Sequence, residues 1–229
     1  MTPETLNVVV LLFPKVTQLD FTGPAQVFSK FPDARVHLAW HTLEPVPTDG
    51  GWCIVPTTTL DDCPAADVLF VPGGEGAFDL FADGVALDFL RSKAADARWI
   101  TSVCTGSFAL AAAGLLTGYR ATSHWASLEM LSEFGAIPVS NRVVRDRDRI
   151  TGAGVTSGID FAFVLAAELY GDEIAQRIQL GIEYDPEPPF DHGSPGKADP
   201  RIVEEIINAT HGRRRAAVRK AADALLTSG

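Results

Sequence analysis

The chain is predicted to fold as an α/β three-layer sandwich, with a mostly parallel central sheet flanked by helices. Short apolar runs rich in β-branched residues alternate along the chain with helical patterns, as parallel sheets require. The first run, Leu6–Phe13, is apolar throughout, which is typical of a strand buried on both faces. The chain has 229 residues, 46% of them hydrophobic, enough for one substantial core.

The strands and helices are expected in the following order. Strands are predicted at Leu6–Phe13, Val36–Trp40, Val68–Val71 and Trp99–Val103, with an antiparallel piece at the sheet edge in Gly50–Thr58 and a hairpin of Arg142–Arg145 and Ile150–Thr151. Gly23-Pro24 is expected to open a short helix that ends near Phe31, because the first turn of a helix does not need the N–H that proline lacks. Further helices are predicted at Val85–Ala95, Gly106–Leu116, Ala126–Phe134, Ile159–Tyr170, Glu173–Ile182, Arg201–His211 and Arg214–Leu226. We expect one domain over residues 1–229, with a helical extension from about residue 185.

Charge and composition narrow the class of partner. The net charge of −10 disfavours binding of the whole chain to nucleic acid. One basic run, His211–Arg215 followed by Arg219 and Lys220, is interpreted as a solvated helix face rather than a nucleic-acid arm. No targeting signal and no apolar stretch long enough to span a bilayer is found, so a cytoplasmic protein without a membrane partner is expected. The three cysteines show no paired spacing, which argues against a disulfide framework or a zinc site.

Cys104 is the candidate nucleophile. It lies between the apolar strand Trp99–Val103 and a helix rich in Ala and Leu, on a tight strand-to-helix turn. In parallel sheets, sites form just beyond the carboxyl ends of the strands. A helix N-terminus behind a thiol favours the thiolate, so the thiol pKa of Cys104 is expected to fall. This is the geometry of a nucleophile elbow with sulfur in place of oxygen. A buried structural cysteine is the alternative, and for Cys53 and Cys63 it is the better interpretation.

Two other strand ends carry candidate residues. Asp20 follows the first strand between apolar neighbours, which are expected to raise the pKa of its carboxyl group, unless it simply caps the following helix. Gly73 and Gly74 follow the strand Val68–Val71, and with the N–H of Thr105 their backbone could bind a developing negative charge. His124 is an alternative partner for Cys104, although a structural histidine fits the sequence equally well. The histidines show no metal-ligand spacing, and no metal or organic cofactor is expected.

Together these segments resemble the ThiJ/PfpI superfamily. The resemblance rests on Pro72-Gly73-Gly74 and on Cys104-Thr105-Gly106-Ser107-Phe108, and it covers roughly Leu6 to Ile182. It implies a flavodoxin-like sandwich with a cysteine nucleophile elbow. Two departures from the usual superfamily pattern, aspartate at Asp20 and threonine at Thr105, are similar to its isocyanide hydratase branch. The segments Glu183-Tyr184 and Pro188-Pro189-Phe190-Asp191 also look like that branch.

The resemblance implies a cofactor-free hydro-lyase that adds water to a small isocyanide and forms an N-substituted formamide. Cys104 would attack the isocyanide carbon to give a thioimidate, and Asp20 would act as acid and then base. Thr105 and the N–H of Gly74 would orient the intermediate. Superfamily members usually form homodimers, so a homodimer is expected.

Other functions fit the same residues. A ligand-sensing domain without turnover is the alternative outside catalysis, since AraC-like regulators carry this domain, although they add a DNA-binding module that the residues after Tyr184 are too few to form. Glyoxalase-like hydration of small dicarbonyls would also use Cys104, but such relatives usually keep glutamate and a nearby histidine. Oxidation of Cys104 as a redox signal is a third alternative.

Overall fold

A computed structural model describes residues 5–227 and has the predicted sandwich architecture. The central sheet has seven strands in the order β10-β11-β7-β6-β1-β2-β5. Its strands are β1 (Leu6–Leu11), β2 (Ala34–Trp40), β5 (Thr58–Thr59), β6 (Val68–Val71), β7 (Trp99–Val103), β10 (Val143–Asp146) and β11 (Arg149–Gly152). Among the described residues, only β10 runs antiparallel to its neighbour in this sheet. The mostly parallel sheet and the predicted hairpin are thus confirmed.

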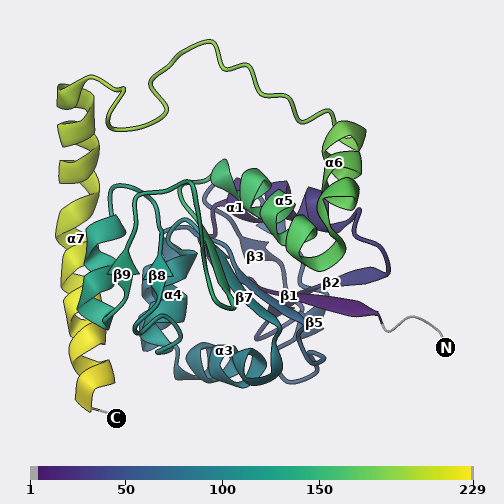
Figure 1. The fold of residues 1–229 in the computed structure, drawn as a ribbon. Helices are drawn as coiled ribbons and strands as arrows, with labels where there is room; N and C mark the ends of the chain where they lie inside the picture. Colours follow the sequence, from purple (N-terminus) through teal and green to yellow (C-terminus); the bar gives the residue numbers. More distant parts are fainter. Residues whose placement is uncertain (1–4, 228–229) are drawn as a thin grey trace.

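Helices cover both faces of the sheet (Figure 1). One face carries α1 (Gln18–Phe28), α5 (Ser157–Tyr170) and α6 (Asp172–Gly181), and the other carries α3 (Gly84–Asp96) and α4 (Gly106–Ala112). Short elements complete this second side: α2 (Gly76–Asp79) and the 3₁₀ segments η1 (Leu80–Ala82) and η2 (Leu128–Phe134). Each face has its own apolar core, so the strands are buried on both sides.

The amino-terminal helix begins earlier than the sequence predicts. It starts at Gln18 rather than Gly23, so Asp20 lies in its first turn and Pro24 lies inside it. The early start is fixed by backbone hydrogen bonds at Thr17, whose carbonyl accepts from Asp20 N at 3.0 Å and whose N–H donates to Gly73 O at 2.9 Å. Tertiary contact with the Gly73 loop therefore outweighs the local signal of Gly23-Pro24.

Other boundaries also differ from the prediction. The edge piece expected at Gly50–Thr58 is split: β3 (Val46–Pro47) and β4 (Cys53–Ile54) form a separate antiparallel pair, while β5 joins the main sheet in parallel. The helix after Cys104 stops at Ala112, because Gly114 has a left-handed backbone with φ of +79°. The helix expected at Ala126–Phe134 is the 3₁₀ segment η2, next to the small parallel pair β8 (Arg120–Ala121) and β9 (Ile137–Pro138).

The carboxyl-terminal region forms one helix, α7 (Pro200–Thr227), where two were predicted. Gly212 does not interrupt it, because Val218 and Ala222 are buried in the core and hold the later turns in place. In Figure 1 a long connection arches from α6 to α7, and α7 lies beside η2. Of the helices that the structure describes, none combines the length and apolar character needed to cross a membrane.

Candidate active site

Three strand ends bring the predicted residues together at one edge of the sheet. Strands β1, β6 and β7 are neighbours and run parallel, so their carboxyl ends lie side by side. Asp20 follows β1, Gly73 and Gly74 follow β6, and Cys104 follows β7. Val16 pairs with Gly74 in an isolated antiparallel bridge, which ties the loop before Asp20 to the glycine loop. The topology thus assembles residues that are far apart in sequence.

Cys104 occupies a strained turn. Its φ of +55° is in the left-handed region, which residues with a Cβ rarely adopt and which costs about 1–3 kcal/mol. Four hydrogen bonds hold this conformation. The N–H of Cys104 donates to Gly152 O at 3.0 Å and Ala153 O at 2.7 Å. Its carbonyl accepts from Ser107 Oγ at 3.0 Å and Ser123 Oγ at 2.9 Å. The backbone at Cys104 is therefore fixed from both sides, as the predicted nucleophile elbow requires.

Gly106 permits the tight approach of this turn to β6. A Cβ at Gly106 would lie 2.5 Å from Pro72 O and would also collide with the carbonyl oxygen of Val71. Any side chain there would push the start of α4 away from the strand. Helix α5 packs from the other side, where Phe161 shares a buried core with Val103 and Cys104.

The carboxyl group of Asp20 is fully buried and lacks ordinary partners. Neither of its oxygens has a hydrogen-bond partner of normal geometry among the described residues. Burial raises the pKa of Asp20 to about 7, although the nearby Cys104 thiol and the N–H of Gly73 counteract part of this effect. The predicted rise of this pKa is confirmed, and the alternative of a simple helix cap fails because the first turn of α1 has no side-chain cap.

The thiol of Cys104 shows the opposite of the predicted pKa shift. Burial raises its pKa well above the usual value, and the charge of a deprotonated Asp20 raises it further, while the N–H of Thr105 acts in the lowering direction. The helix N-terminus behind the thiol does not outweigh burial. Because both groups resist losing a proton next to one another, the Asp20–Cys104 pair retains at least one proton at neutral pH.

Gly73 is the point at which the site residues meet. A Cβ built on Gly73 would lie 2.5 Å from Asp20 Oδ2, 2.6 Å from Cys104 Cβ and 2.7 Å from Thr105 N. Real Cβ atoms do not approach other atoms so closely, so only glycine leaves the carboxyl, the cysteine and the Thr105 backbone this near to one another.

The side chain of Thr105 is bound to the backbone of Gly74. Its Oγ1 accepts from Gly74 N at 2.8 Å and donates to Gly74 O at 2.9 Å. The N–H of Gly74 is therefore occupied and not free to stabilise a developing negative charge in this arrangement, which corrects the expectation for that residue. The N–H of Thr105, by contrast, lies beside the Cys104 thiol.

His124 has other neighbours. Its Nδ1 accepts from Ala126 N at 3.3 Å, its ring lies against Trp125, and burial together with the charge of Arg214 lowers its pKa. None of these contacts links it to Cys104. Sequence reasoning missed Ser123, the preceding residue, whose hydroxyl holds the Cys104 carbonyl. No spacing signal marks that serine, because the contact depends on the loop after β8. Cys53 is exposed and Cys63 is buried away from Asp20.

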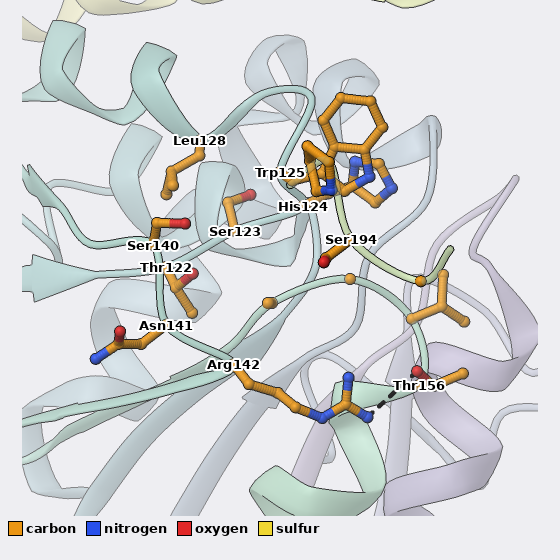
Figure 2. A pocket seen from close by; sticks show the side chains of 15 residues that line it. Thr122, Ser123, His124, Trp125, Leu128, Ser140, Asn141, Arg142, Thr156 and Ser194 are labelled. Carbon is orange, nitrogen blue, oxygen red and sulfur yellow. Dashed lines mark hydrogen bonds between the residues drawn. The ribbon is translucent and has the colours of Figure 1, made fainter. Parts of the chain in front are cut away.

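A pocket of about 400 Å³ opens next to the Cys104 turn (Figure 2). Ser123 and Ala153, which bind the backbone of Cys104, both line it. Figure 2 shows His124 and Trp125 at one side, Ser194 beside them, and the Arg142 guanidinium bonded to Thr156. Across residues 5–227, no cluster of three or more His, Cys, Asp or Glu side chains is arranged to hold a metal ion.

The fold and the site define an α/β sandwich protein with a buried cysteine on a nucleophile elbow and a protonatable carboxyl beside it. The model of the DJ-1/PfpI family matches residues 6–168, so the chain belongs to that family. It is 55% identical over 200 residues to the isonitrile hydratase of Pseudomonas putida, an alignment covering 87% of this chain and 88% of that protein.

Two further comparisons bear on the fold and on the alternatives. A ThiJ/PfpI family protein from Pseudomonas syringae has a crystal structure similar to this one, with a TM-score of 0.92, 42% identity, and coverage of 96% of this chain and 91% of that chain. The HTH-type transcriptional regulator GbdR of Pseudomonas aeruginosa is 36% identical over 152 residues, which cover 64% of this chain but 41% of the regulator. The likeness to the regulator is thus confined to part of each protein.

Proposed function

We propose that this protein is an isocyanide hydratase, which adds water to an isocyanide to give an N-substituted formamide through a thioimidate on Cys104. The observation that carries the proposal is the buried Asp20 carboxyl beside Cys104, with a pKa raised to about 7 and no other hydrogen-bond partner of normal geometry in the described residues. The high identity to an isonitrile hydratase over most of both chains supplies the substrate class.

In the first step, the Cys104 sulfur attacks the terminal carbon of the isocyanide. A carbon–sulfur bond forms and the carbon–nitrogen triple bond becomes a double bond. The proton that the Asp20–Cys104 pair retains is delivered by Asp20 to the same carbon, which yields a neutral thioimidate. A carboxyl with a pKa of about 7 suits this role, because it is partly protonated at neutral pH and still a useful acid.

In the second step, the Asp20 carboxylate takes a proton from water while the oxygen bonds to the thioimidate carbon. Asp20 then returns that proton to the nitrogen. Collapse of the tetrahedral intermediate breaks the carbon–sulfur bond, releases the formamide, and leaves one proton again on the Asp20–Cys104 pair. The net change is one water added to one isocyanide, and no metal or organic cofactor is needed.

Thr105, Gly73 and Gly74 are proposed to support these steps differently. The N–H of Thr105 lies beside the sulfur and stabilises the thiolate. Gly73 leaves the space in which carboxyl and thiol approach one another. Gly74 holds the Thr105 side chain through its N–H and carbonyl, instead of binding the intermediate.

We propose that the pocket beside Ser123 and Ala153 receives the substituent of the isocyanide. We also propose a cytoplasmic homodimer built from single-domain chains. The large apolar side chains of Leu180 and Phe190 are 83% and 79% exposed, and contact with a second copy would remove them from water. The elution of the purified protein in size-exclusion chromatography with light scattering tests the dimer.

The proposal is tested by incubating purified protein with an aryl isocyanide and following the formamide by NMR, with methylglyoxal in a parallel reaction. Rapid formamide production without turnover of the dicarbonyl supports the hydratase. Dicarbonyl hydration alone would assign the glyoxalase-like reaction. Ligand-induced stabilisation without turnover of either compound would assign a sensor.

A further inference from the structure

We propose that Arg214, on α7, is a positioning residue that holds the Gly73–Gly74 loop through Glu75 and thereby fixes Thr105 beside Cys104. This inference rests on the proposed function, because it concerns the rate of the same site. It gives a role to a basic run that the sequence predicts to be a solvated helix face. It also gives a role to α7, which lies outside residues 6–168 matched by the family model.

The contacts of Arg214 are those of a docked side chain. Its Nε donates to Glu75 Oε1 at 2.8 Å, its Nη2 also bonds to Glu75 Oε1, and its Nη1 donates to Ser127 Oγ at 3.1 Å. The guanidinium lies over the ring of Phe78 at 5.4 Å, and the side chain is 12% exposed. Although the Glu75 side chain is 40% exposed, a largely buried guanidinium bonded on several sides fixes its partner better than a fully exposed ion pair does.

Glu75 connects this contact to the reacting groups. It directly follows Gly74, whose N–H and carbonyl are both bound to Thr105 Oγ1. The N–H of Thr105 in turn lies beside the Cys104 thiol. Gly76, on the other side of Glu75, packs against the backbone of Pro14 so closely that a Cβ there would collide with it. A shift of Glu75 therefore moves Gly74 and, through the Thr105 side chain bound to it, the residue whose N–H lies beside the thiol.

Neighbouring arginines on α7 provide a contrast. Arg213 also bonds to Glu75, at 3.0 Å, but its side chain is 64% exposed, so water screens that pair. Arg215 is exposed and forms no ion pair within residues 5–227. Arg215 is therefore a matched control, because it has the same charge on the same helix without the contact to the loop.

The test uses the full-length protein with Arg214→Met, Arg214→Lys, Glu75→Gln, the double variant Arg214→Met/Glu75→Gln, and Arg215→Met. Three quantities are measured for each: kcat and KM for an aryl isocyanide, the pH dependence of Cys104 alkylation by iodoacetamide, and the melting temperature. Mass spectrometry of peptides assigns the alkylation to Cys104. The alkylation reports on the thiol without isocyanide chemistry, so a failure of the proposed reaction is distinguished from a failure of this inference.

We expect Arg214→Met to lower kcat about 10- to 100-fold, as small displacements of catalytic groups do, with KM within about twofold of wild type. The pH midpoint of alkylation is expected to rise. Arg214→Lys keeps the charge without the forked contact and is expected to fall between wild type and Arg214→Met. The double variant should match the more impaired single variant, because both changes break one connection. Arg215→Met should behave as wild type.

Two results would overturn the inference. The first is a folded Arg214→Met protein whose kcat and alkylation profile match wild type, even with a lower melting temperature, since that reports structural docking alone. The second is a double variant whose losses are the product of the single losses, since Arg214 would then act independently of Glu75. If Arg214→Met does not fold, Arg214→Lys and Glu75→Gln carry the same comparison.

Discussion

The Asp20 carboxyl and the Cys104 thiol lie against one another across Gly73, at a point where even one added Cβ would be 2.5 Å from Asp20 Oδ2. Both groups are buried, and burial makes each hold its proton more firmly. In the proposed reaction, this pair would supply its own proton without taking one from solvent. That property suits an addition in which the nucleophile and the acid must act at the same carbon.

Replacement of Cys104 by alanine is expected to abolish turnover and leave the fold intact. Cys104→Ala removes the sulfur but keeps a Cβ, so the left-handed backbone and its four hydrogen bonds are preserved. Formamide production and circular dichroism are measured together. Cys53→Ala is the control, because Cys53 is exposed and lies outside the buried core that contains Cys104. Turnover by folded Cys104→Ala protein would show that Cys104 is not the nucleophile.

Replacement of Asp20 by asparagine is expected to lower kcat by at least about 100-fold, since the amide cannot cycle a proton. Wild-type activity should also fall at alkaline pH, where the Asp20–Cys104 pair loses its remaining proton. The rate is measured from pH 5 to pH 10 in both proteins. Full activity in Asp20→Asn would remove the acid–base role.

The same variant should change how stability depends on pH. The pKa of Asp20 is about 7 in the folded protein and takes the ordinary aspartate value of 3.8 in the unfolded chain, so the folded state binds more protons than the unfolded state between these two pH values. Wild-type stability therefore decreases as pH rises from about 4 to about 7. The asparagine of Asp20→Asn does not titrate. The free energy of unfolding of the variant should therefore rise relative to that of wild type over this pH range, by at most about 4 kcal/mol.

Urea unfolding at pH 5 and pH 8 measures this difference. Asp61→Asn, at an exposed position, is the control and should show the same small difference at both pH values. A difference between wild type and Asp20→Asn that does not change with pH would argue against the raised pKa.

A methyl group at Gly73 is expected to separate the site residues. Gly73→Ala would force Asp20, Cys104 or Thr105 to move and should lower kcat more than it lowers stability. Gly84→Ala is the matched control, because a Cβ there meets nothing within 4 Å. Steady-state kinetics and thermal unfolding compare the two. Wild-type kinetics in Gly73→Ala would show that the close approach is not required.

Loss of the Thr105 hydroxyl is expected to lower both stability and rate. Thr105→Val leaves the buried N–H of Gly74 without this partner, which costs roughly 1–3 kcal/mol, whereas the Gly74 carbonyl keeps its hydrogen bond from Ala77 N at 3.2 Å. Thr105→Ser should restore most of the loss. Thr101→Val removes another buried hydroxyl, bonded to Leu69 O at 2.8 Å, and should lower stability without a matching fall in kcat. Equal kinetic effects of Thr105→Val and Thr101→Val would contradict a specific role for Thr105.

The strands could be predicted, because buried parallel strands are apolar throughout. It could also be predicted that Asp20, Gly73 and Cys104 lie close together, because the carboxyl ends of parallel strands share one edge of the sheet. The start of α1 could not, since it depends on Thr17 bonding to Gly73, a contact distant in sequence. The thiol pKa was predicted in the wrong direction, because a local pattern reveals the helix behind a cysteine but not how deeply the fold buries it. Glu75 and Arg214 carried no local signal, since their contact joins a loop to a distant helix.

The central claim is a covalent bond between the isocyanide carbon and Cys104. It is tested most directly by intact-protein mass spectrometry of wild-type protein quenched rapidly during reaction with excess aryl isocyanide. The account predicts a species heavier than the protein by the mass of one isocyanide, located on Cys104 by peptide sequencing and absent from Cys104→Ala. Formamide production by wild type with no such species on Cys104, and with turnover retained in Cys104→Ala, would contradict it.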